Sequence, residues 1–205
     1  MTRVGGPARL TTLPNLLGVA RIVATPVVIV LLLLPFPGAG LLAFGVFAVA
    51  AVTDTLDGRI ARARGQVSPL GVFMDLTADK VLVAGVLIAM VEVELLPTWI
   101  VAVILIRELV IAGVRQVAAS EDVVMAAGSL GKWKTIVTLV ATAVLLLAFD
   151  ARTDGPVAGL GLTEALLVAG FWLMVLAAAM TVLSGWAYLR AALPMLLGDD
   201  KAPPT

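Results

Sequence analysis

The chain has 205 residues, of which 61% are hydrophobic and 14% are charged, and its 14 basic side chains balance its 14 acidic ones. Soluble domains have about 45–50% apolar and about 25% charged residues, so this composition excludes a protein that exposes most of its surface to water. The absence of cysteine and histidine excludes disulfides, thiol nucleophiles, imidazole bases and the usual zinc ligands. A formal net charge of zero gives no reason to expect nucleic acid as a partner.

The predicted elements are six apolar helices, because a membrane span needs about 20 apolar residues and a helix satisfies its own backbone. The first run has no small-residue cleavage site after it, so we interpret it as a retained helix and not as a signal peptide. The runs cover, in chain order, residues 15–35, 41–62, 73–96, 98–115, 135–149 and 162–189. We expect one all-α membrane domain over 1–205, with a cytoplasmic N-terminal segment at 1–12 and a disordered tail at 198–205.

Lysine and arginine are distributed unevenly among the connections between these runs. If the N-terminus is cytoplasmic, the connections on the far side contain one basic residue, Arg152, and the other 13 of the 14 lie on the cytoplasmic side or at the helix ends next to it. Cytoplasmic loops carry an excess of lysine and arginine. The sequence therefore predicts six spans with both termini in the cytoplasm.

Four aspartates flank the polar turn between the second and third runs. Asp54 and Asp57 are three residues apart near the end of the second run, and Asp75 lies four residues before Asp79 near the start of the third. Each pair therefore shares a helix face. If a tight loop places the two helices side by side, the carboxylates converge, and their repulsion favours either protonation or a bound cation. Oxygen ligands select Mg²⁺, Mn²⁺ or Ca²⁺, and paired ions of this kind usually clamp a phosphoryl group.

Small and basic residues accompany these aspartates. Gly58 and Ala61 share the face of the first pair and would let a ligand approach the helix backbone, although each also fits simple helix packing. Arg62 can offer a planar fork to a phosphate, and Ser68 can add a neutral donor. The combination favours a phosphate-containing ligand over the alternative that the four acids are only solvated helix ends.

A second charged group follows in the fourth and fifth runs. Arg107 and Glu108 lie inside the fourth run, where ionisable residues are costly and are candidates for function by default; the alternative is that Glu108 merely neutralises Arg107. Arg115, Lys132 and Lys134 are expected at the same cytoplasmic level as the aspartates. They either extend to lipid headgroups or form a pocket for a second, anionic substrate.

The pattern D-x2-D-G-x2-A-R-x8-G-x3-D-x3-D is complete from Asp54 to Asp79, and it resembles the signature of the CDP-alcohol phosphotransferase family of membrane enzymes. Further similarity in LPNLLGVARIVATP, ADKVLVA, IREL and GKWKT resembles the bacterial phosphatidylglycerophosphate synthase branch, although Leu76 replaces the proline common there. The resemblance covers positions 13 to about 140. It implies a six-helix fold, commonly a homodimer among membrane lipids, with a cytoplasm-facing cavity in the bacterial inner membrane.

The family's motif implies roles for particular residues of this sequence. The residues that would hold two Mg²⁺ or Mn²⁺ ions are Asp54, Asp57, Asp75 and Asp79, and Asp79 would also be the general base. The residues that would hold the CDP group are Asp54, Asp57, Gly58, Ala61, Arg62, Ser68 and Asn15. The residues predicted to bind the phosphate of the acceptor do not come from the motif, and they are Arg115, Lys132, Lys134 and Arg107 of the second charged group and Arg21 of the first run.

The resemblance implies transfer of the phosphatidyl group of CDP-diacylglycerol to glycerol 3-phosphate, with release of CMP. Inositol phosphate, or phosphatidylglycerol in a cardiolipin-forming version, are alternative acceptors. The group of Arg115, Lys132 and Lys134 favours a small phosphorylated alcohol over a lipid acceptor. The resemblance in IREL and GKWKT favours glycerol 3-phosphate over inositol phosphate. A divalent-cation transporter would also place aspartates in helices, but transporter sites tend to lie at the midplane of repeated halves, and this chain shows no repeat.

Overall fold

A computed structural model of the chain describes residues 13–63, 69–120 and 129–197, with the backbone alone at 13–15, 54–63, 69–76, 79, 129 and 196. Over these ranges the chain forms six α-helices and one short 3-10 helix. The elements are α1 (Leu13–Leu33), α2 (Ala39–Ala63), α3 (Pro69–Glu92), α4 (Thr98–Ser120), α5 (Ser129–Arg152), η1 (Pro156–Leu160) and α6 (Thr163–Leu196). The prediction of an all-helical fold with six long helices is confirmed for the described chain. The predicted segments 1–12 and 198–205 lie outside it.

Several helices extend beyond the apolar runs that predicted them. Helix α5 begins at Ser129 and α6 continues to Leu196, whereas the apolar runs begin at 135 and end at 189. The reason is that hydropathy marks the part of a helix that suits lipid, while the backbone hydrogen bonds continue through polar residues at the interface. Pro69 opens α3, where the missing proline N–H costs nothing because the first turn has no intrahelical acceptor for it.

Three of the described helical segments are long and apolar enough to cross a membrane. They are Leu16–Leu33, Leu130–Arg152 and Thr163–Met195, and α2 adds a shorter apolar stretch, Ala39–Thr53. Large apolar side chains such as Leu109, Trp172 and Leu183 are more than half exposed, which is unfavourable in water and favourable in lipid. The described helices thus agree with the predicted membrane location.

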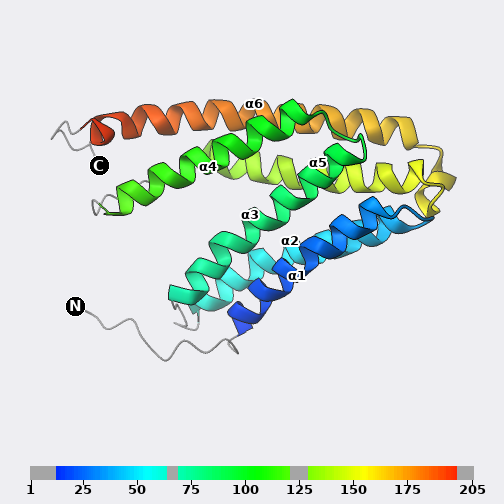
Figure 1. Ribbon diagram of the computed structural model, residues 1–205, viewed down its shortest axis with the longest axis horizontal. Coiled ribbons are helices and arrows are strands. Elements are labelled where there is room, and N and C mark those ends of the chain that lie inside the picture. Colours follow the sequence, from blue (N-terminus) through cyan, green and yellow to red (C-terminus); the bar gives the residue numbers. More distant parts are fainter. Residues whose placement is uncertain (1–12, 64–68, 121–128, 198–205) are drawn as a thin grey trace.

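Successive helices run in opposite directions, so that the three connections at 34–38, 93–97 and 153–162 lie at one end of the bundle, which we call the loop end (Figure 1). At the other end, the terminal end, α2 ends and α3 begins. Helix α1 packs against α2 and α3, and α6 packs against α4 and α5. We call α1, α2 and α3 the first group of helices, and α4, α5 and α6 the second group. Contacts between α2 and α5 join the groups, and the groups diverge toward the terminal end (Figure 1).

A buried polar contact fixes the loop end. The Asp150 side chain is fully buried, and its two carboxylate oxygens accept hydrogen bonds from the backbone N–H groups of Leu41 and Val157, each at 3.0 Å. A Cβ built on Gly40 would lie 2.3 Å from the Asp150 nitrogen, so only glycine lets α2 approach α5 this closely. The first and second groups are therefore joined firmly at the end from which they diverge.

Candidate active site

The four aspartates of the motif lie on two helix segments at the terminal end. The backbone of Asp54 and Asp57 belongs to the last turns of α2, and that of Asp75 and Asp79 to the second and third turns of α3. Both segments reach the same end of the bundle (Figure 1), and both helices pack against α1. The side chains of these residues lie outside the described part of the chain, so the predicted convergence of the carboxylates stays a prediction.

The donor set at these helix ends suits a divalent ion. Two pairs of aspartates, spaced i,i+3 on α2 and i,i+4 on α3, provide oxygen ligands alone, which Mg²⁺ and Mn²⁺ prefer. The residues present therefore fit the two ions that the motif implies. The side chains predicted to hold CDP also lie outside the described residues; these are Asn15, Gly58, Ala61, Arg62 and Ser68.

A cluster of charges, which we call the Glu108 cluster, consists of Glu108, Arg107, Lys134 and Lys80, the residue that follows Asp79 on α3. Glu108 Oε2 accepts a hydrogen bond from Lys80 Nζ at 3.2 Å. Glu108 Oε1 accepts hydrogen bonds from Arg107 Nη1 at 2.8 Å and from Lys134 Nζ. One carboxylate on α4 thus binds three cations from α3, α4 and α5. The simpler interpretation from sequence is that Glu108 merely neutralises Arg107. That describes only one of the three contacts of Glu108.

Arg107 also connects α4 to α6. Its Nη2 donates a hydrogen bond to Ser184 Oγ at 3.1 Å, and its side chain lies against Gly185, where an added Cβ would come within 2.9 Å of Arg107 Cγ. Both terminal nitrogens of Arg107 are therefore bonded within the protein. The structure assigns Arg107 contacts with α6 in addition to the acceptor-binding role predicted from sequence.

The other predicted acceptor residues occupy different environments. Arg115 is exposed on α4; its Nε donates a hydrogen bond to Tyr188 Oη at 3.1 Å, and its guanidinium carbon lies 5.6 Å from the centre of that ring. Lys132 is exposed in the first turn of α5, whereas Lys134 is buried in the Glu108 cluster. Arg21 is buried on α1 in the first group. Among the five, the structure therefore joins Arg107 and Lys134 through Glu108.

Sequence reasoning missed Lys80 and Tyr188. Lys80 directly follows Asp79, but its partner Glu108 is 28 residues away, a separation at which helix periodicity carries no information. Tyr188 is the only tyrosine in the chain, and it lies in the last third, where the resemblance to the family rests on hydropathy alone. The one available signal in the sequence was a single tyrosine near the expected membrane–water interface.

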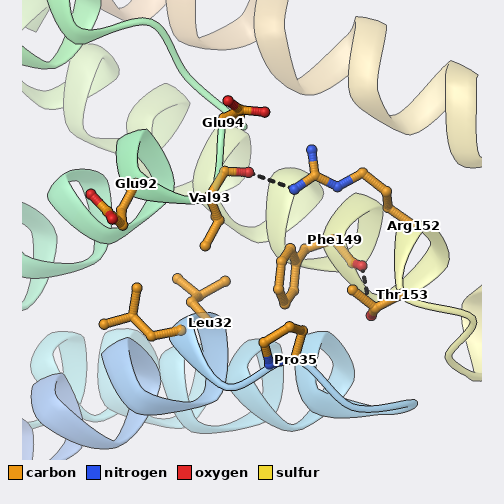
Figure 2. Close-up of a pocket in the computed structure, with 9 residues that line it drawn as sticks. Leu32, Pro35, Glu92, Val93, Glu94, Phe149, Arg152 and Thr153 are labelled. Carbon is orange, nitrogen blue, oxygen red and sulfur yellow. Dashed lines mark hydrogen bonds between the residues drawn. The ribbon is translucent and has the colours of Figure 1, made fainter.

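A hollow at the loop end is a separate feature (Figure 2). The described residues that line it are Leu32, Leu33, Pro35, Glu92, Val93, Glu94, Phe149, Arg152 and Thr153. Arg152 Nη2 donates a hydrogen bond to the backbone oxygen of Val93, and its guanidinium carbon lies 5.8 Å from the centre of the Phe149 ring. This hollow is at the opposite end from the aspartates and contains none of the predicted site residues, so it is not the candidate active site.

The fold and the site define an α-helical membrane protein with an acidic motif on two helix ends and a basic cluster beside it. The sequence model of the CDP-alcohol phosphatidyltransferase family matches residues 11–183. The chain belongs to this family, which confirms the resemblance seen in the motif.

Curated relatives are similar over most of the chain. The CDP-diacylglycerol–glycerol-3-phosphate 3-phosphatidyltransferase of Bacillus subtilis is 38% identical over 86% of this chain and 92% of its own length. A probable phosphatidylglycerophosphate synthase of Mycobacterium tuberculosis is 34% identical over 93% of this chain and 86% of its own. The cardiolipin synthase (CMP-forming) of Oryza sativa is 34% identical over 93% of this chain, which spans 60% of that relative's length.

Proposed function

We propose that the chain transfers the phosphatidyl group of CDP-diacylglycerol to glycerol 3-phosphate and releases CMP. The observation that supports this proposal is that Lys80, the residue after Asp79, donates a hydrogen bond to Glu108, so that the Glu108 cluster includes a residue of the helix that carries Asp75 and Asp79. Such an arrangement suits a reaction that joins two phosphate-containing substrates. The names of the bacterial relatives, which match along most of their lengths, support the same acceptor.

The residues of the acidic motif would hold the donor. Two Mg²⁺ or Mn²⁺ ions, bound by Asp54, Asp57, Asp75 and Asp79, would supply charge neutralisation at the pyrophosphate. Residues with small or donor side chains would hold the rest of the CDP group; these are Asn15, Gly58, Ala61, Arg62 and Ser68. The acyl chains of the donor would stay in the lipid beside the apolar helices.

Asp79 would be the general base. It would take the proton from the primary hydroxyl of glycerol 3-phosphate, whose oxygen then attacks the phosphorus that carries diacylglycerol, while the bond from that phosphorus to CMP breaks. A base must lie within about 3 Å of the proton that it removes. A carboxylate next to two cations would be a weak base, so much of the rate would come from holding the two substrates in line. The basic residues would provide that alignment at the acceptor.

The phosphate of the acceptor would be bound by Arg115, Lys132 and Lys134, with contributions from Arg107 and Arg21. Arg115 and Lys132 are exposed and can meet a substrate that arrives from water. Lys134 and Arg107 already share Glu108, so they would act on the phosphate while they remain paired with that carboxylate.

The position of the site in the cell follows from the distribution of charge. Because 13 of the 14 basic residues lie, in the six-span topology, in segments on one side or at the helix ends next to them, the termini and the aspartates would face the cytoplasm of a bacterial inner membrane. We propose one domain over the whole chain, assembled as a homodimer.

A cardiolipin-forming reaction is the second candidate, because the rice cardiolipin synthase matches 93% of this chain. It would use phosphatidylglycerol as acceptor, and inositol phosphate is a third possible acceptor. The experiment is to measure CMP release from CDP-diacylglycerol by the purified chain with each acceptor, with and without Mg²⁺ or Mn²⁺. CMP release with glycerol 3-phosphate and with no other acceptor would support the proposal. CMP release with phosphatidylglycerol and with no other acceptor would replace it with the second candidate.

The substitution Asp79→Asn should abolish CMP release while CDP-diacylglycerol still binds, because an amide cannot accept the proton of the acceptor hydroxyl. CMP release and binding of labelled CDP-diacylglycerol would be measured on the same preparation. Glu92→Gln, at the loop end of the same helix, is the matched control and should keep both. Full turnover in Asp79→Asn would remove Asp79 from the role of base.

A further inference from the structure

Glu108 does more than neutralise its neighbour Arg107, because it also binds residues of two other helices. Its partners come from α3, its own helix and α5, and Arg107 in turn is bonded to Ser184 on α6. The side chain of Glu108 is 27% exposed and that of Lys134 is 11% exposed. Separating a partly buried ion pair leaves a charge without compensation, which is strongly destabilising, so Arg107 and Lys134 keep Glu108 within the second group.

The link from Glu108 to Lys80 has a special place in the bundle. The connection at 93–97 and the Asp150 contact join the two groups at the loop end, and the groups diverge from there (Figure 1). Helix α3 packs mainly on α1 and α4 mainly on α6. Among the residues whose side chains are described, the Lys80–Glu108 pair is the ion pair that crosses from the first group to the second.

Lys80 directly follows Asp79 on α3, so any movement of Lys80 moves the backbone that carries Asp79. The geometry points to Glu108 as a positioning residue, which sets the separation between the aspartate-bearing helix α3 and the basic residues of α4 and α5. For the reaction, this inference rests on the proposed function. Glu108 would touch neither substrate, and it would act by keeping the base and the acceptor site in register.

The separation can be measured without any assay of activity, since the chain has no cysteine. Cysteines placed at Val81 on α3 and Leu183 on α6, both exposed and next to the Glu108 cluster, would carry spin labels. Distances between the labels would be measured by pulsed electron resonance in lipid nanodiscs. We expect one narrow distribution in the parent protein and a broadened or displaced one after Glu108→Gln, with Glu92→Gln as the control that leaves it unchanged.

Lys80→Met provides a second variant in case Glu108→Gln fails to fold. It removes the link between the groups but leaves Arg107 and Lys134 paired with Glu108. We expect Lys80→Met to broaden the same distribution and Lys80→Arg to restore it, because arginine can still donate to Glu108. An effect of Lys80→Met that Lys80→Arg also shows would mean that the link is not the cause.

The kinetic signature of positioning is a fall in kcat with little change in KM. We expect kcat for CMP release to fall by about 10- to 100-fold in Glu108→Gln, because a misplacement of about 1 Å between reacting groups can cost about 100-fold in rate. In Lys80→Met, which leaves Arg107 and Lys134 paired with Glu108, the KM values for CDP-diacylglycerol and glycerol 3-phosphate should change by less than about three-fold. Glu108→Gln and Lys80→Met should not add up in the double variant if they act through one link.

The outcomes separate the two proposals. A wild-type protein that releases no CMP with any acceptor would contradict the proposed function, while the distance measurement would still test the link. An unchanged distance distribution in both Glu108→Gln and Lys80→Met would overturn the positioning role. A large rise in the acceptor KM at unchanged distance would also overturn it, since Glu108 would then shape the binding site directly.

Discussion

Asp150 occupies a position at which one side chain controls the meeting of three elements. Its carboxylate lies at the end of α5 and accepts hydrogen bonds from Leu41 in the first turn of α2 and from Val157 in η1. The N-terminus of a helix has backbone N–H groups without intrahelical partners and carries a partial positive charge. A buried carboxylate from another helix can satisfy both, which explains how a charged residue is accommodated in the interior of this bundle.

Asp150→Ala should lower the free energy of unfolding by about 3 kcal/mol, because two buried N–H groups lose a charged acceptor. The melting temperature in detergent would fall, while the KM values of the protein that remains folded should not change. Asp154→Asn is the matched control: Asp154 is exposed with a φ of 55°, a conformation that asparagine also tolerates. Equal melting temperatures for the Asp150 variant and the parent protein would contradict the role of the buried carboxylate.

Tyr188 acts on one of the proposed acceptor residues. Its hydroxyl accepts the hydrogen bond from Arg115 Nε at 3.1 Å, which holds the Arg115 side chain against α6. Tyr188→Phe keeps the ring under the guanidinium and removes only this acceptor. We expect the KM for glycerol 3-phosphate to rise by about two- to five-fold, since a net hydrogen bond contributes about 1 kcal/mol.

Steady-state kinetics with varied acceptor would check this effect, and the comparison variants are Arg115→Ala and Lys132→Ala. Each should raise the acceptor KM more than Tyr188→Phe does, because each removes a charge from the proposed phosphate site. Unchanged kinetics in both alanine variants would contradict the assignment of the acceptor site to these residues.

At the level of the elements, small residues determine how closely two helices pack. A Cβ built on Gly85 of α3 would lie 2.6 Å from Thr25 Cγ2 of α1, and threonine, which is branched at Cβ, cannot easily rotate away within a helix. Membrane helices associate closely through such small residues, because lipid provides no hydrophobic force between them. Gly85 therefore determines the contact of α3 with α1.

Gly85→Ala should reduce the free energy of unfolding by about 1–3 kcal/mol, the usual cost of overpacking. Gly113 on α4 gives the matched control, since nothing lies within 4 Å of a Cβ built there, and alanine suits a helix better than glycine by about 0.5–1 kcal/mol. Thermal unfolding in detergent should thus show a loss for the first variant and no loss for the second. A stable Gly85→Ala protein would mean that α1 and α3 can separate slightly without cost.

On the scale of the whole molecule, the orientation in the membrane can be read with single cysteines. Ser120 at the end of α4 and Leu160 in η1 lie at opposite ends of the bundle and are exposed. If both termini are cytoplasmic, a membrane-impermeant maleimide should label Leu160→Cys in intact spheroplasts. It should label Ser120→Cys only after permeabilisation, and the reverse pattern would invert the proposed topology.

The local sequence determined the helices and the identity of the acidic motif. Runs of apolar residues long enough to span lipid predicted six helices, and the observed bounds differ mainly where polar residues extend a helix, as at Ser129. The spacing of Asp54 and Asp57, and of Asp75 and Asp79, places each pair on one helix face because an α-helix repeats every 3.6 residues. These properties depend on neighbours within a few turns, and the sequence shows them directly.

Only the tertiary structure decided which side chains meet across helices. Lys80 binds Glu108 at a separation of 28 residues, Arg107 binds Ser184 at 77, and Asp150 binds the N–H of Leu41 at 109. Such contacts depend on how each helix is rotated about its axis and how close it lies to its neighbours. Side-chain packing between distant segments, as at Gly85 and Gly185, sets the rotation of each helix and its distance from its neighbours. Hydropathy and residue spacing along the chain contain no information about either.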